Sequence, residues 1–116
     1  MTAQNKPLGR LTRRAEFLYV REGAYRAIGA VVVQARVNSD HEDIRVGFTA
    51  TKKIGNAVIR NKAKRRLRET ARQLLPNMGV AGVDYVFIAR QGTVRRDFTG
   101  LLDDTRQALL KLRLKE

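Results

Sequence analysis

The sequence contains no cysteine and no tryptophan, only one histidine and only two prolines. Without cysteine there is no disulfide, no thiolate metal ligand and no thiol nucleophile, which excludes cysteine-based zinc modules and cysteine enzymes. This composition fits a reducing cytoplasm. The sequence has no run of about 18 apolar residues, so it predicts no transmembrane helix. Residues Met1 to Arg14 contain no apolar segment of the signal-peptide type.

Acidic residues are scarce relative to basic ones. The chain of 116 residues has 24 Lys and Arg against 11 Asp and Glu, for a net charge of +13. The excess is concentrated, because residues 52–72 hold nine bases and one acid, Glu69. A clustered positive charge predicts a polyanionic partner, of which nucleic acid is the commonest. The 43% apolar content is enough for one modest core, so we expect residues 1–116 to form a single domain.

Residues that could support catalysis by the protein are few. His41 stands in the polar loop at 38–43, which could hold a cation but is more typical of a solvated hairpin. Asp103 and Asp104 are neighbours on an expected helix, so their side chains diverge. We find no phosphate-binding loop and no nucleophile motif. The sequence therefore predicts no catalytic residue, no metal site and no cofactor bound by the protein.

The pattern of apolar residues predicts an α+β domain of two layers. Residues 1–12 read as a flexible basic tail. A half-buried strand at Ile44, Val46 and Phe48 follows the polar loop, which suggests a hairpin. The other expected elements are a helix at 15–22, a strand at 25–37 broken at Gly29, a helix at 57–75, a strand at 83–89 buried on both faces, and a helix at 97–114.

The helix expected from residue 57 has two contrasting faces. Asn56 is a suitable N-cap, and Pro76 and Gly79 are expected to end the helix. At 100° per residue one stripe is suited to a core: Ile59, Ala63, Leu67, Thr70 and Leu74. The opposite stripe is basic or amide: Asn61, Lys64, Arg65, Arg68 and Arg72. A rigid row of cations with arginine forks suits backbone phosphates.

Other interpretations of the basic helix are weaker. A solvated helix face usually mixes charges of both signs, and only Glu69 is available here. A helix that reads the DNA major groove would carry base-reading side chains near its start, where Ala57, Val58 and Ile59 stand. The apolar stripe is too thin for a membrane-bound helix. A ribosomal protein fits the size and charge, and composition alone does not exclude it.

The run from Lys52 to Glu69, KKIGNAVIRNKAKRRLRE, resembles the signature of the bacterial ribonuclease P protein family. The similarity extends to Leu11–Phe17, to Arg45–Gly47 and to Asp84–Arg90. The signature is long and tightly spaced, so it favours this family over a ribosomal protein.

The resemblance implies a mostly four-stranded central sheet with flanking helices, ribosomal protein S5 domain 2-like, with a left-handed βαβ crossover. It implies the accessory subunit of an endoribonuclease that removes the 5′ leader of precursor tRNA in the cytoplasm. The catalytic RNA requires Mg²⁺ and performs the cleavage. The implied partners are this RNA and precursor tRNA, with no membrane and no obligate protein partner.

The resemblance also assigns residues. The implied RNA contacts are Lys52, Lys53, Asn56, Arg60, Asn61, Lys62, Lys64, Arg65, Arg68 and Arg72. A cleft between the first helix and the sheet is implied to hold the single-stranded leader, with Phe17, Arg21, Arg45 and Arg90 beside it. Phe17 would stack on a base, although ordinary core packing explains this residue equally well.

Three features depart from the family pattern. Lys62 stands where arginine is frequent, which keeps the charge but loses the fork. Arg21 stands where a second cleft aromatic is frequent, and no aromatic occurs at 30–37. Leader binding is therefore expected to depend more on charge, unless Tyr19 or Tyr25 supplies a second ring.

Overall fold

The structure, a computed structural model, describes residues 8–114 and contains five strands and three α-helices. The strands are β1 (Leu8–Arg10), β2 (Ala24–Ile28), β3 (Val31–Val37), β4 (Ile44–Thr49) and β5 (Val83–Ala89). The helices are α1 (Arg14–Arg21), α2 (Ala57–Met78) and α3 (Phe98–Lys111), with short 3₁₀ turns η1 (Lys52–Ile54) and η2 (Gln91–Thr93).

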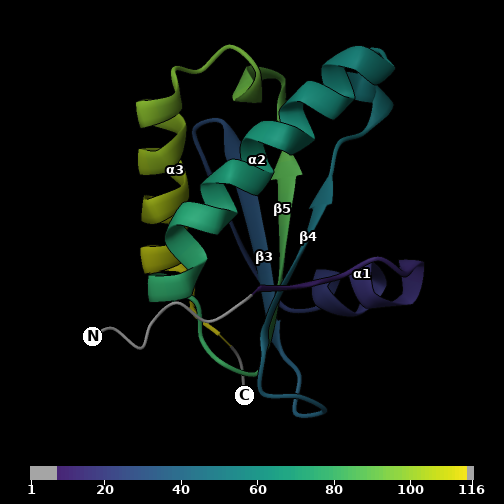
Figure 1. The fold of residues 1–116 in the computed structure, drawn as a ribbon, viewed down its shortest axis with the longest axis vertical. Helices are drawn as coiled ribbons and strands as arrows, with labels where there is room; N and C mark the ends of the chain where they lie inside the picture. The colour runs from purple at the N-terminus through teal and green to yellow at the C-terminus, as the bar shows by residue number, and fades with distance from the viewer. Residues whose placement is uncertain (1–7, 115–116) are drawn as a thin grey trace.

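The strands form one mixed sheet in the order β1-β4-β5-β3-β2. Both β1 and β5 run parallel to β4, whereas β3 is antiparallel to β5 and β2 is antiparallel to β3. The connection from β4 through α2 to β5 joins neighbouring parallel strands. With α2 in front of the sheet and both strands pointing up, β5 lies to the left of β4, so the crossover is left-handed (Figure 1). Only about 2% of such connections have this hand.

The main core lies between the sheet and the layer formed by α2 and α3, which lie side by side across one face (Figure 1). Phe87 from β5 is fully buried there, and Phe48 meets it edge to face with ring centroids 6.0 Å apart. Leu67 and Leu75 of α2 and Leu101 of α3 are completely buried against this face. Helix α2 therefore has a fixed orientation on the sheet.

Helix α1 packs on the opposite face of the sheet over a smaller cluster. Val20 is fully buried there with Leu11 and Val86, and Phe17, Tyr19 and Ile88 pack around them. Since one helix cannot cover a five-stranded face, much of this side of the sheet stays uncovered. The sheet thus has a filled face toward α2 and α3 and a partly open face toward α1.

The predicted α+β class is confirmed, with helices on both faces of the sheet and not in the single helical layer expected, but three details of the elements were wrong. The sheet has five strands, because Leu8–Arg10, placed in the expected tail at 1–12, pair with β4 and Leu11 is buried; residues 1–7 lie outside the described part. Strands β3 and β4 form no hairpin, because β5 lies between them. The expected strand at 25–37 divides at Gly29 as predicted, where φ is +53°.

The third error concerns the end of α2, which continues through Pro76 to Met78. Pro76 lacks an N–H, so the Arg72 carbonyl loses its partner within the helix, but Arg72 is exposed and water can replace that bond. Leu74 and Leu75 are buried just before it, and the Gly79 N–H closes the helix on the Leu75 carbonyl at 2.8 Å. Packing of this last turn thus outweighs the proline signal.

Candidate nucleic-acid interface

The start of α2 is fixed by local contacts that also present a basic loop. The Asn56 side chain accepts a hydrogen bond from the Ile59 N–H at 3.0 Å, the N-cap predicted from the sequence. Gly55 has a φ of +146°, and a Cβ there would lie 2.8 Å from the Ile59 Cδ1 atom. Lys52 and Lys53 occupy η1 immediately ahead and are exposed. The lysines are therefore held beside the amino end of the helix.

The outer face of α2 carries a row of exposed cations. Ala63, Leu67, Thr70 and Leu74 of the predicted stripe are buried, whereas Ile59 stays 37% exposed near the helix start. The side chains on the outer face are exposed: Asn61, Lys62, Arg65, Arg68 and Arg72. Within residues 8–114, Glu69 is the one carboxylate that forms an ion pair with a cation of α2. The predicted apolar stripe is confirmed except at Ile59, and the predicted basic stripe is exposed except at Lys64, which is only partly exposed.

Glu69 forms its ion pair within α2 and neutralises only one arginine. Arg72 donates two hydrogen bonds to its carboxylate, and Gln73 donates a third at 3.0 Å. The contact with Arg72 lowers the pKa of Glu69 to about 2, so it stays ionised at neutral pH. Arg72 is consequently engaged in an ion pair, whereas Arg65 and Arg68 form no ion pair within residues 8–114.

Two arginines of α2 donate side-chain hydrogen bonds to neighbouring backbone carbonyls. Arg60 donates to the Gly55 carbonyl at 3.1 Å and so supports the helix start. Arg66 donates to the Arg96 carbonyl just before α3, with its guanidinium 5.9 Å from the centre of the Phe98 ring. Arg60 was predicted to contact RNA, and its charge still lies at the edge of the basic face, but part of its donor capacity is used internally.

An open groove of about 730 Å³, which we call the α1 groove, lies between α1 and the uncovered side of the sheet. Phe17, Leu18 and Arg21 line it from α1, and Lys64 reaches it from α2. Its remaining lining residues are Thr12, Arg14, Gln34, Phe48, Thr49, Ala50, Thr51, Val86 and Ile88. Three cations and no carboxylate line this groove, so its charge suits an anionic strand.

Phe17 fits into the groove because β4 has no side chain opposite it. A Cβ at Gly47 would lie 2.6 Å from the Cζ atom of Phe17. The Phe17 ring is only partly buried and packs at the edge of the small α1 cluster. The inner edge of Phe17 therefore packs on the protein and the remainder lines the groove, and its stacking on a base stays a prediction.

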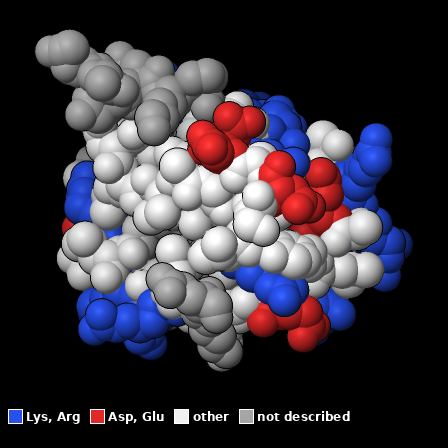
Figure 2. Space-filling model, turned by 90° about the horizontal axis from the view of Figure 1, so that it is seen from below, with Lys and Arg blue, Asp and Glu red and all other residues white. Residues whose placement is uncertain are grey.

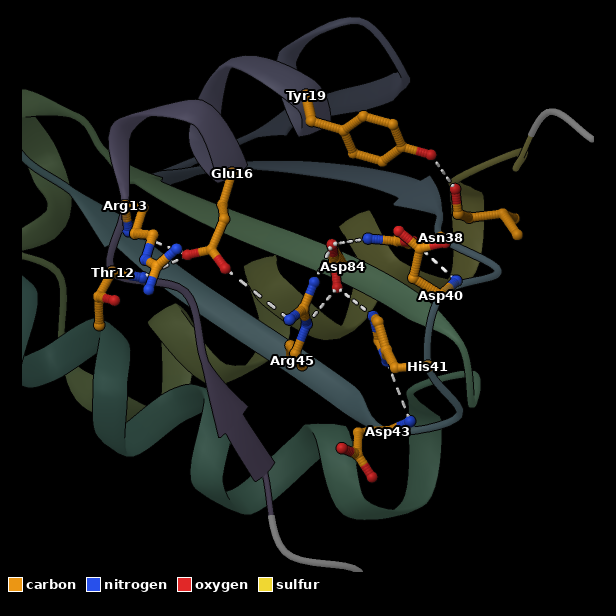
Figure 3. Close-up of polar contacts among 11 residues, drawn as sticks. Thr12, Arg13, Glu16, Tyr19, Asn38, Asp40, His41, Asp43, Arg45 and Asp84 are labelled. Atoms are coloured by element: carbon orange, nitrogen blue, oxygen red, sulfur yellow. Dashed lines mark hydrogen bonds and ion pairs between the residues drawn. The ribbon is translucent and has the colours of Figure 1, made fainter.

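Arg45 and Arg90, also assigned to the cleft, do not line the α1 groove. Arg45 donates from Nε and Nη2 to the two carboxylate oxygens of Asp84, each at 2.9 Å (Figure 3). Asp84 is buried, and such a charge must be paired. Arg90 donates to the Gly29 carbonyl at 3.2 Å and is exposed beyond the end of β5. The structure thus brings Phe17, Arg21 and Lys64 together and leaves these two arginines apart.

Asp84 is the centre of a polar cluster that the sequence did not reveal. His41 contacts its Oδ1 atom at 2.8 Å, and Asn38 donates to Oδ2 at 3.0 Å (Figure 3). The His41 Nδ1 atom accepts from the Asp43 N–H at 3.0 Å, so the ring proton lies on Nε2 and points to Asp84. The loop at 38–43 is therefore anchored, and His41 is a structural residue.

Burial by itself raises the pKa of Asp84, but hydrogen bonds from Arg45, Asn38 and His41 outweigh it and lower the pKa below the ordinary value of 3.8. The same contact with Asp84 raises the pKa of Arg45. Within residues 8–114 no three acidic, histidine or cysteine side chains are grouped so that they could hold a metal ion. The buried carboxylate thus serves the fold.

Charge is distributed unevenly over the surface. Figure 2 shows the lower end of the molecule, away from the start of α2, where acidic groups lie among uncharged surface and cations stand at the edge. Helix α2 begins at the opposite end (Figure 1). The exposed Lys52 and Lys53 of η1, which precede α2, therefore lie away from this mixed surface.

Comparison with known proteins assigns this arrangement to a family. The family model described as Ribonuclease P matches residues 6–113. The chain belongs to the ribonuclease P protein family. The ribonuclease P protein component of Ruegeria pomeroyi is 53% identical over 105 residues, covering 88% of this chain and 84% of that protein. That of Caulobacter vibrioides is 52% identical over 104 residues, covering 89% and 70%.

Solved structures of ribonuclease P proteins share the fold. The protein from Staphylococcus aureus superposes with a TM-score of 0.74 at 28% identity, over 87% of this chain and 92% of that one. The protein from Thermotoga maritima superposes with a TM-score of 0.71 at 31% identity, over 84% and 92%. The left-handed crossover seen here therefore belongs to a fold found in other ribonuclease P proteins.

Sequence reasoning missed several groove residues of this ribonuclease P family member. Arg14, Gln34 and Thr49 line the α1 groove, and none was singled out beforehand. Gln34 and Thr49 stand at positions of β3 and β4 that face α1. The alternation of residues along the strands shows this, but it identifies groove residues only once the position of α1 is known.

No described helix is both long enough and apolar enough to cross a membrane.

Proposed function

We propose that this chain is the protein subunit of ribonuclease P and that it binds the catalytic RNA and the leader of precursor tRNA in the cytoplasm. In this proposal the RNA, with Mg²⁺, cleaves the phosphodiester bond that releases the mature 5′ end. The protein contributes binding energy and charge and has no catalytic residue of its own.

One observation carries the proposal: the basic face of α2 is continuous with the α1 groove at Lys64. The outer face of α2 presents exposed arginines, and Lys64 extends from the same helix into the groove lining. A structured RNA on the helix face and a single strand in the groove would thus be held side by side. The membership of the ribonuclease P family supports the identity of these two nucleic acids.

The chemistry of the two surfaces differs as their ligands would require. Arg65 and Arg68 have free guanidinium forks on a rigid helix, which suits the phosphates of a folded RNA. The α1 groove has an aromatic ring, apolar strand residues and cations at its rim, which suits unpaired bases and their backbone. Cations that neutralise phosphates of both the folded RNA and the leader would reduce the electrostatic repulsion between these two nucleic acids.

The test is binding of ribonuclease P RNA by the variant Arg65→Ala/Arg68→Ala over a series of salt concentrations. We expect the affinity at low salt to fall about 10- to 100-fold, and the steep negative log–log salt slope to become shallower by about 1.5 to 2. Thermal unfolding should be unchanged within about 0.5 kcal/mol, because both side chains are exposed.

The matched control is Arg106→Ala/Arg113→Ala, which removes the same net charge from exposed positions on α3 and just after it. This variant should bind RNA nearly as the unmodified protein does. Equal losses in the two variants would mean that overall charge, and not the face of α2, governs binding, and no loss in either would contradict the proposed interface.

A further inference from the structure

Beyond the α1 groove, the same face of the sheet carries an exposed tyrosine, Tyr25, that no part of the family resemblance assigns. Strand register places four residues in one row: Gly47 on β4, Val86 on β5, Gln34 on β3 and Tyr25 on β2. Residues directly opposite each other in neighbouring strands point to the same face of a sheet. Phe17 lies over Gly47, so this row runs from the Phe17 ring to Tyr25.

The alternate residues of β2 confirm which way Tyr25 points. Arg26 donates to the Lys111 carbonyl at the end of α3, and Ile28 packs against the main core. Both therefore lie on the face covered by α3. Because side chains alternate along a strand, Tyr25 lies on the α1 side together with Gln34, which lines the groove.

Tyr25 is the tyrosine that remains available for a ligand on this face. Its side chain is 67% exposed, and within residues 8–114 it has no hydrogen bond. Tyr19 is already engaged: its hydroxyl donates to the Val37 carbonyl at 2.5 Å, and the Arg36 guanidinium lies 4.0 Å from its ring centre. Tyr19 borders a different hollow, with Glu22 and Ser39, and not the α1 groove.

The spacing of the two rings suits a single strand. From β4 to β2 the row crosses three strand intervals, or about 14 Å. A strand with stacked spacing of about 3.4 Å per nucleotide covers this span with about four nucleotides, and a stretched strand needs fewer. Gln34, between the two rings, offers an amide that can donate to or accept from a base edge.

We propose that Tyr25 is a second stacking platform for the single-stranded leader and that it holds a base two to four nucleotides from the one against Phe17. The proposal rests on the proposed function, because the leader is its ligand. It gives the open edge of the sheet a role, and it supplies a second ring although Arg21 stands where a second cleft aromatic is frequent and no aromatic occurs at 30–37.

The experiment uses holoenzyme reconstituted with ribonuclease P RNA and measures affinity for two precursor tRNAs. One has a leader of about two nucleotides, too short to span the row, and the other a leader of about eight. Tyr25→Ala should weaken binding of the long-leader substrate about tenfold and leave the short-leader substrate unchanged. Tyr25→Phe keeps the ring and should bind as the unmodified protein does.

The control is Leu110→Ala on α3, a residue with 65% exposure, nearly that of Tyr25. It should change neither substrate. If Phe17→Ala weakens long-leader binding and Tyr25→Ala does not, the assignment of Tyr25 is overturned and the proposed function stands. If neither affects either substrate, leader binding in the groove fails, and the Tyr25 proposal fails with it. Equal loss for both substrates in Tyr25→Ala would also overturn it.

Discussion

Arg45 and Asp84 face each other on neighbouring parallel strands and are joined by two hydrogen bonds of 2.9 Å. The pair connects three parts of the molecule. Asp84 also binds His41 and Asn38 of the loop before β4, and Arg45 lies 3.8 Å from the Glu16 carboxylate on α1 (Figure 3). The pair therefore adds a charged contact to the apolar cluster of Leu11, Val20 and Val86 that holds α1 beside the α1 groove.

Replacing Asp84 with asparagine should destabilise the fold by about 2–4 kcal/mol. The change removes the charged partner that accepts two hydrogen bonds from Arg45, whose side chain is only 24% exposed, and leaves it the more distant Glu16 carboxylate at 3.8 Å. Urea unfolding followed by circular dichroism measures the loss. Asp103→Asn is the control, because Asp103 is 57% exposed and pairs loosely with Arg106 at 3.6 Å, so its loss should cost less than about 0.5 kcal/mol. Equal stability of the two variants would contradict a structural role for the pair.

The same cluster predicts sensitivity to acid. The pKa of Asp84 is lower in the folded chain than its ordinary value, and backbone hydrogen bonds from Arg13 and Thr12 lower the pKa of Glu16 in the same way. A carboxylate with a lowered pKa contributes fully above its unfolded value near 4 and loses this contribution as the pH falls toward the folded value. Stability should therefore decline below about pH 4, and less steeply in Asp84→Asn. Parallel pH profiles of the two proteins would show that Asp84 is not responsible.

Gly47→Ala should disturb the groove directly. The added Cβ would lie within 2.7 Å of two atoms of the Phe17 ring, so the ring or the strand must move. We expect a loss of about 1–3 kcal/mol in stability and weaker binding of long leaders. Gly92→Ala is the matched control, since its Cβ would meet only the Ala30 Cβ at 3.7 Å. Unchanged stability and leader binding in Gly47→Ala would mean that the ring position does not matter.

The sequence contained enough to predict every helix and strand except β1, and the basic face of α2. Asn56 as N-cap, the buried positions of α2 and the apolar run of β5 depend on local chemistry and helical or strand periodicity, which a sequence displays. The Arg65 and Arg68 positions follow from the same projection. The signature from Lys52 to Glu69 added the family and its crossover hand, which no periodicity contains.

Contacts between distant segments could not be predicted in this way. Asp84 and His41 are 43 residues apart and meet only because β5 inserts beside β4, which also removes the expected hairpin. Leu8–Arg10 become a strand only because β4 offers a free edge. The position of Tyr25 beside Gln34 likewise depends on strand register, which hydrophobic pattern alone left open.

The most direct test of the proposed function is reconstitution of cleavage. The purified protein is mixed with a bacterial ribonuclease P RNA at low Mg²⁺ concentration, and a labelled precursor tRNA is added. The proposal predicts cleavage at the mature 5′ end only when both components are present. Cleavage by the protein alone, or RNA binding without any rescue of cleavage, would contradict it.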